Sequence, residues 1–157
     1  MPPVAAAAMT LLERIESAMR DAMRARDERR TQTLRMAMAA AQNRRIELGR
    51  ALTDEEVVDV LGKQLKQRRE SIEVYRSAGR EEQAGNEEAE AAILAEFLPE
   101  QLTVDEVEEL ARAAIADTGA AGSRDMGRVM GALAPQTRGR ADGRMVSEVV
   151  RRLLAER

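Results

Sequence analysis

Apolar residues recur at helical spacing along nearly the whole chain. The first such stretch places Leu11, Leu12, Ile15, Met19 and Met23 on one stripe, which predicts an amphipathic helix beginning at Thr10. No segment alternates apolar and polar residues over the length of a strand. The pattern therefore predicts an all-α fold in which each helix turns one apolar face inward.

Three helix starts carry the same signal. In each, a threonine is followed three residues later by a glutamate, so the hydroxyl accepts from one backbone amide while the carboxylate reaches back to another. The pairs are Thr10 with Glu13, Thr53 with Glu56, and Thr103 with Glu106. We expect a capping box at each of these positions.

Four helices are predicted before Pro99. The second covers about residues 28–48 and the third about residues 54–78, each followed by a glycine suited to end it. The fourth starts near Glu81 and ends before Pro99, which cannot continue a helix. Five glutamates between residues 81 and 90 make its first half polar almost all round, so we expect a solvated connector there.

A change of composition from Leu98 to Thr103 predicts a domain boundary. We expect an N-terminal helical domain over residues 9–99 and a C-terminal three-helix domain over residues 100–157, with helices at about 104–117, 124–134 and 143–155. Residues 1–8 are expected to form a disordered extension. A domain of under 60 residues buries only about 60% of its extended surface, so the second domain is marginal alone.

The composition removes several classes of chemistry. The chain has no Cys and no His, which excludes a thiolate nucleophile, a zinc–thiolate site and the commonest general base. We expect no catalytic residue, no metal and no cofactor. No apolar run approaches the roughly 20 residues of a membrane span, so a cytoplasmic location is the default expectation.

The glycine-rich run from Gly119 to Gly127 leads into a predicted helix. A phosphate-binding P-loop needs Lys and Ser or Thr after its last glycine, and here Arg128 and Val129 follow. We therefore expect Ser123 to cap the helix that follows and Gly119 to end the helix before it.

Positive charge gathers near the carboxyl end. Residues 119–157 hold eight arginines and four acids, a local charge of +4 in a chain of net charge −3. An arginine fork in a glycine-flanked loop at a helix start suits phosphate, and helix-end amides would add donors. The candidate nucleic-acid-binding residues are Arg124, Arg128, Arg138, Gly139, Arg140, Gly143 and Arg144, with a second basic face formed by Lys63, Lys66, Arg69 and Arg76.

These cations have a plainer interpretation, because charged faces of helices are usually solubilising. If they do bind nucleic acid, two aromatic residues in the whole chain are too few for base stacking along a single strand. Folded, double-helical RNA read by its shape fits the composition better.

Several runs of residues make the chain resemble the GatB/YqeY family, small proteins similar to the C-terminal tail of the GatB component of the tRNA-dependent amidotransferase. They are Leu34-Arg-Met with Gln42-Asn, Leu65-Lys-Gln-Arg-Arg-Glu-Ser71, Tyr75 to Arg80, Phe97-Leu-Pro-Glu-Gln-Leu102, Asp125-Met-Gly-Arg-Val-Met-Gly131 and Arg138-Gly-Arg-Ala-Asp-Gly143. The resemblance implies two helical subdomains and a non-catalytic, tRNA-binding accessory module. The tail's basic loop maps onto Arg138, Gly139, Arg140 and Gly143.

Two alternatives stay open. One is a protein-interaction adaptor, with a partner in translation or amidotransfer. The other is carbon–nitrogen ligase activity with glutamine as amido-N-donor. The resemblance places that chemistry in other domains and in a different polypeptide of the amidotransferase.

Overall fold

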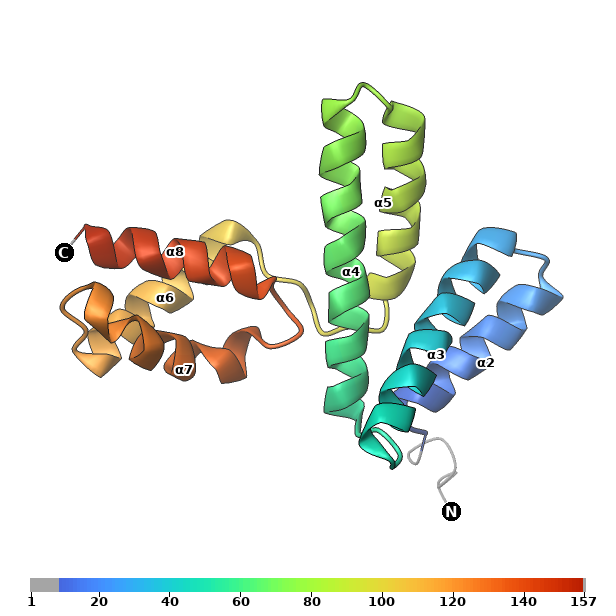
Figure 1. Cartoon of the computed structure of the whole chain (residues 1–157), viewed down its shortest axis with the longest axis horizontal. Helices are drawn as coiled ribbons and strands as arrows, with labels where there is room; N and C mark the ends of the chain where they lie inside the picture. Colours follow the sequence, from blue (N-terminus) through green and yellow to red (C-terminus); the bar gives the residue numbers. More distant parts are fainter. Residues whose placement is uncertain (1–8, 157) are drawn as a thin grey trace, which may run out of the picture. The chain divides into compact units, whose positions relative to one another are not determined.

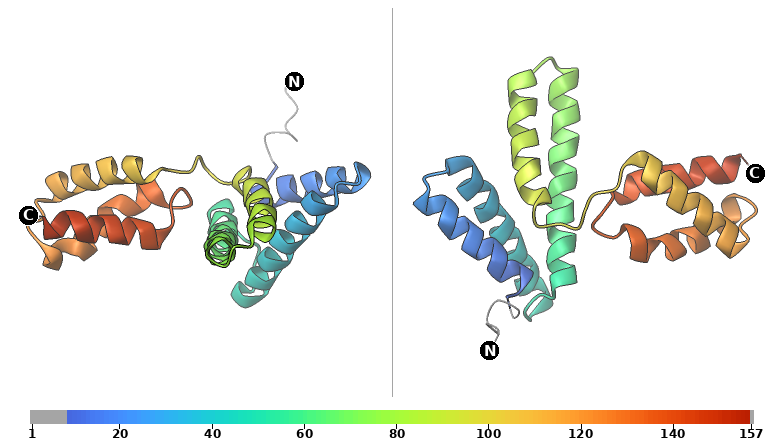
Figure 2. Two further views of the ribbon diagram at one scale, coloured as in Figure 1. Left: turned by 90° about the horizontal axis from the view of Figure 1, so that it is seen from above. Right: turned by 180° about the vertical axis from the view of Figure 1, so that it is seen from behind.

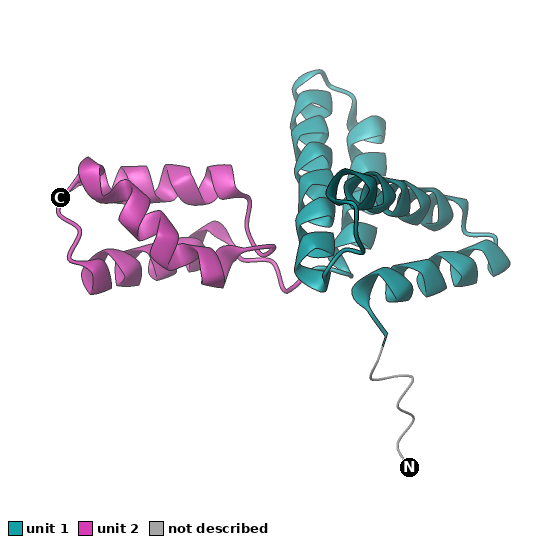
Figure 3. Cartoon of the chain, turned by 60° about the horizontal axis from the view of Figure 1, so that its bottom comes forward, with its two compact units in different colours: residues 1–98 teal, residues 99–157 magenta. Residues whose placement is uncertain are grey.

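The computed structural model describes residues 9–156, and all regular secondary structure in that range is helical, which confirms the all-α prediction. The expected extension over residues 1–8 lies outside the described residues. The chain divides into two compact units, Met1–Leu98 and Pro99–Arg157 (Figure 3). Each unit is described by itself below.

Unit 1 consists of two helical hairpins. They are formed by α2 (Leu11–Arg24) with α3 (Glu28–Leu48), and by α4 (Asp54–Ser77) with α5 (Glu81–Ala95). Short connections make the helices of each hairpin antiparallel (Figure 1). Helix α3 packs against α2 and also against both helices of the second hairpin. The core between the hairpins contains Leu11, Ile15, Leu34, Val57, Leu61, Leu65 and Leu94.

Unit 2 is a three-helix domain with a short 3-10 turn. Its elements are α6 (Val104–Thr118), η1 (Ser123–Asp125), α7 (Met126–Thr137) and α8 (Gly143–Ala155). Each of the three α-helices packs against the other two (Figure 2). The core they share is made of Val107, Ala111, Ile115, Val129, Leu133, Val146, Val150, Leu153 and Leu154.

Two of the three predicted capping boxes are complete. Thr53 with Glu56 and Thr103 with Glu106 exchange both side chain–backbone bonds. At the third, the Thr10 hydroxyl accepts from the Glu13 amide at 3.1 Å and donates to the Glu13 carboxylate, also at 3.1 Å. The Glu13 carboxylate accepts no bond from the Thr10 backbone amide, so the box at Thr10 is only half formed.

Three helices end at a glycine in the left-handed conformation, and the sequence predicts all three of these ends. Gly49, Gly79 and Gly119 have φ values of +70°, +73° and +69°. Helix α2 ends differently, because Arg26 takes this place with φ +57°. Among the described residues it is the one non-glycine with positive φ.

The prediction of a solvated connector in the first half of α5 is wrong. Ala84 lies in that half and is fully buried, with 0% of its surface exposed. Arg68 of α4 forms ion pairs with Glu87, at 3.1 Å, and with Glu90. Glu87 and Glu90 therefore link α5 to α4 through ion pairs, and the low apolar content of this half reflects this pairing between helices.

Three smaller expectations also fail. Met23 is 50% exposed, because Ala22 takes the inward position at the end of α2. Ser123 makes no capping bond, and the Asp125 carboxylate instead accepts from the Ala121 amide at 2.8 Å. Helix α7 continues past Pro135 to Thr137, since a proline in the last turn removes only one backbone bond.

Candidate nucleic-acid interface

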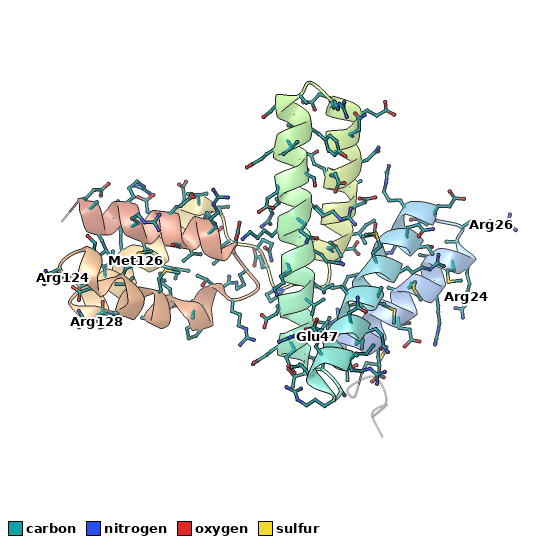
Figure 4. All side chains as sticks on the ribbon, viewed as in Figure 1. Arg24, Arg26, Glu47, Arg124, Met126 and Arg128 are labelled. Carbon is teal, nitrogen blue, oxygen red and sulfur yellow. The ribbon has the colours of Figure 1, made fainter. Side chains whose placement is uncertain are left out.

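The candidate arginines of unit 2 lie at the two ends of α7. Arg124 in η1 and Arg128 in the first turn of α7 lie at one end (Figure 4). Arg138 and Arg140, in the connection to α8, and Arg144, in the first turn of α8, follow the other end. At a rise of 1.5 Å per residue, the ten residues from Arg128 to Arg138 separate the two groups by about 15 Å along α7.

Arg140 is held in place by uncharged partners. Its Nε donates to the Glu100 carbonyl at 3.1 Å, and its Nη1 donates to the Gln136 carbonyl at 3.2 Å. The side chain is half-buried, and in the described part of the chain it forms no hydrogen bond with a carboxylate. Carbonyls orient a guanidinium without neutralising it, so Arg140 presents a fixed positive charge with further N–H donors to spare.

The backbone around Arg140 is tied to the start of unit 2. The Leu102 amide donates to the Arg140 carbonyl at 2.7 Å, and Gln101 Nε2 donates to the Gly139 carbonyl at 2.7 Å. Together with the bond from Arg140 Nε to Glu100, we call these three bonds the clasp. The turn needs a left-handed residue, which Gly139 supplies with φ +73°.

One part of the sequence-based interpretation needs correction. The sequence predicts that the amides at the start of α8 add donors for a phosphate. The Asp142 carboxylate caps this helix and accepts from the Arg144 amide at 3.1 Å. Because a carboxylate occupies the helix end, an incoming phosphate would meet like charge there, and the guanidinium groups become the relevant donors.

Arg128 and Arg144 are exposed, and each has a carboxylate partner. Arg128 Nη2 lies 2.9 Å from Asp125 Oδ1, and Arg144 Nε lies 3.4 Å from Glu148 Oε1. The Ala121 amide, with a further contribution from Arg128, lowers the pKa of Asp125. Exposed pairs of this kind contribute little free energy, so both arginines can exchange their partner for a phosphate. Arg124 is exposed, and its side chain pairs with no residue of the described range.

The surface of α7 between the two arginine groups has two exposed positions without side chains. Gly127 and Gly131 lie one turn apart, both are exposed, and a Cβ added at either would meet no atom within 4 Å. No packing neighbour explains these glycines. Sequence reasoning missed this surface because it treated Gly127 as part of a P-loop-like run, although the spacing from Gly127 to Gly131 signals one helix face.

The opposite charge is concentrated on α6. Residues 103–118 hold five acids and one arginine. Glu108 accepts from Arg112 at 2.8 Å and from Arg152 of α8 at 3.0 Å, and these bonds lower its pKa, with Arg112 contributing most. Unit 2 therefore has an acidic helix and an arginine-bearing α7, and Arg152 belongs with the acidic helix.

The second basic face, on α4, belongs to unit 1. Lys63 and Arg69 are exposed, whereas Lys66 is half-buried. Arg76, expected on the same face, forms ion pairs with Glu81, at 3.5 Å, and with Glu88. These two glutamates of α5 compensate the charge of Arg76, so the positive charge of this face of α4 is smaller than the sequence suggests.

Other kinds of site find no support in the described range. Within residues 9–156, no three acidic side chains are grouped as metal ligands. No described helix is both long enough and apolar enough to cross a membrane.

Comparison with known proteins identifies the family. The family model described as Yqey-like protein matches residues 12–154. A curated relative from Pyrenophora tritici-repentis (strain Pt-1C-BFP), altered inheritance of mitochondria protein 41, mitochondrial, is 29% identical over 147 residues, which are 92% of this chain and 81% of the relative. Because the family model spans nearly the whole chain, the protein belongs to the Yqey-like family.

Proposed function

We propose that the protein is a non-catalytic accessory module that binds structured tRNA through arginine–phosphate contacts of unit 2. The observation that carries the proposal is Arg140, whose guanidinium is positioned by two backbone carbonyls and has no carboxylate partner among residues 9–156. A positioned guanidinium loses little entropy on binding and matches phosphate with a bidentate fork.

The surface around Arg140 suits a duplex better than a single strand. Along α7, Arg128 lies about 15 Å from Arg138, and the exposed glycines Gly127 and Gly131, which form the glycine face, lie on the helix between the two arginine groups. Because Gly127 and Gly131 carry no side chain, the backbone of α7 can approach a sugar–phosphate surface closely. The wide, shallow minor groove of A-form RNA offers such a surface, with phosphates along both edges.

The test is a titration of bulk tRNA with the full chain at two salt concentrations. Three to five phosphate contacts, at about 0.7–0.9 in log–log slope each, predict a loss of roughly 10–500-fold in affinity between 50 and 200 mM salt. We expect the double variant Arg124→Gln/Arg138→Gln to bind several-fold more weakly and with a smaller slope. Arg112→Gln, on the acidic helix of the same unit, is the control for removing a cation.

A bulky residue on the glycine face provides a second test. Leucine is a better helix former than glycine, and the site is open, so we expect Gly131→Leu to leave the melting temperature unchanged or raise it. The same change should weaken tRNA binding by blocking close approach. Equal tRNA affinity of the wild type, the double variant and Gly131→Leu would reject this surface.

A further inference from the structure

The turn between α2 and α3 has an uncommon composition for its backbone conformation. The Arg26 amide donates to the Met23 carbonyl at 3.2 Å, and the Asp27 amide donates to the Ala22 carbonyl at 2.9 Å. This closure requires a left-handed residue between the helices. In the described range, the chain uses glycine at each other left-handed position, namely Gly49, Gly79, Gly119 and Gly139. Arg26 is the exception and carries backbone strain that a glycine would relieve.

The arginines around this turn divide into two pairs. Arg29 donates to Asn86 Oδ1 at 2.9 Å, and Arg30 pairs with Glu96 at 2.6 Å, so both are engaged by the second hairpin. Arg24 and Arg26 instead lie at the outer end of their own hairpin (Figure 4). We call Arg24 and Arg26 the turn arginines.

The turn arginines are available to a partner. The Arg26 side chain is exposed and makes no hydrogen bond or ion pair with any residue of the range 9–156. Arg24 lies 3.2 Å from Asp21, and the two side chains are 78% and 71% exposed, so this pair is weak. Asp27 caps α3, where its carboxylate accepts from the Arg30 amide at 3.0 Å. A strained position thus carries an arginine whose side chain stabilises no contact within the described fold.

We propose that the turn arginines form a second phosphate contact for structured RNA, in addition to the arginines of unit 2. The inference rests on the proposed function, since the ligand is the same RNA. Residues 20–30 hold five arginines and three acids, a local charge of +2 in a chain of net charge −3, so the turn attracts a polyanion that the chain as a whole repels. Two small contacts on one chain strengthen each other, because the first raises the local concentration of RNA at the second.

The experiment compares variants of the full chain in titrations with bulk tRNA at 50 and 200 mM salt. Arg26→Gly removes the cation and relieves the backbone strain together. We expect it to raise the melting temperature by about 2–6 °C and to weaken tRNA binding by roughly 2–5-fold. A role confined to the fold would raise the melting temperature and leave tRNA binding as it is.

The double variant Arg24→Gln/Arg26→Gly should bind tRNA roughly 5–30-fold more weakly at 50 mM salt, with the log–log slope reduced by about 1.4–1.8 for two lost contacts. The matched control is Arg14→Gln/Arg35→Gln, which removes the same charge from exposed positions of α2 and α3, the helices that the turn connects. We expect the control to stay within about twofold of the wild type, since screening limits the effect of distant charges.

The outcomes separate this inference from the proposed function. If the wild type binds tRNA and the variants at the turn bind it equally well, the second contact is overturned and the surface of unit 2 stands. If only the variants at the turn lose affinity, the second contact stands and the assignment to unit 2 fails. If the wild type does not bind tRNA, both are overturned.

Discussion

At the scale of single residues, arginine acts in two distinct ways in this protein. Arg140 donates to carbonyls, which do not compensate its positive charge. Arg50 instead donates to both carboxylate oxygens of Glu56, at 2.7 and 3.0 Å, and this carboxylate compensates its charge. The sequence shows the same residue type in both places. Only the partners decide whether an arginine remains available to a ligand.

The pair of Arg50 and Glu56 predicts a pH dependence of stability. Hydrogen bonds from Arg50, and then from the Thr53 backbone, lower the pKa of Glu56 to about 2. Because the folded pKa is depressed, this contribution is present above the unfolded pKa of about 4.3 and is lost as the pH falls toward 2. Glutamine at this position keeps the capping box and removes the charge.

We therefore expect Glu56→Gln to lower the free energy of unfolding at pH 7, with the difference from wild type shrinking between about pH 5 and pH 2. Urea denaturation across this range measures the difference. A difference that stays constant with pH would show that the ion pair does not contribute. Glu13→Gln is a suitable control, because the Glu13 carboxylate has no arginine partner in the described range.

At the scale of elements, the sequence predicted the helices well and the roles of their polar faces poorly. Helix α3 covers the predicted residues and ends at Gly49 as the glycine rule predicts, because such signals are local. The first half of α5 was misinterpreted because its partner is Arg68, about 20 residues away on α4, and no local rule reports such a pairing. For the same reason, the sequence does not predict the hydrogen bond from Arg140 Nε to the Glu100 carbonyl, 40 residues away.

The contact between α4 and α5 gives the second prediction. The Arg68 side chain is only 13% exposed, and it lies between Glu87 and Glu90, which are 21% and 27% exposed. Arg68→Met would leave two half-buried carboxylates facing each other. We expect a loss of about 2 kcal/mol in the free energy of unfolding, measured by urea denaturation.

A second variant separates charge from packing at this site. In Arg68→Met/Glu90→Gln one of the two carboxylates is gone, so we expect part of the lost stability to return. Equal stability of the single and double variants would contradict the account of α5 as a helix fastened by ion pairs.

At the scale of the whole molecule, the clasp determines where unit 2 begins. Residues 100–102 precede the first helix of the unit, yet Leu102 packs against its core and bonds to Arg140. The connection between α7 and α8, which carries Arg138 and Arg140, is therefore hydrogen-bonded to the start of unit 2. The family match over residues 12–154 identifies the family of the chain but does not show the hydrogen bonds of the clasp.

We expect a fragment of residues 99–157 to be more stable than one of residues 104–157. The shorter fragment lacks the clasp and the Thr103 cap, and losing these hydrogen bonds together costs about 3 kcal/mol. A unit of under 60 residues has little stability to lose. Thermal melting followed by circular dichroism compares the fragments, and equal melting temperatures would show that the clasp is dispensable.

The placement of the lysines has a practical consequence. The only side-chain amines of the protein belong to Lys63 and Lys66, both on α4. Amine-directed reagents therefore modify the side chains of one helix in unit 1 and leave every guanidinium intact. A fluorophore coupled there would leave the arginines that we propose as RNA contacts in unit 2 chemically unaltered.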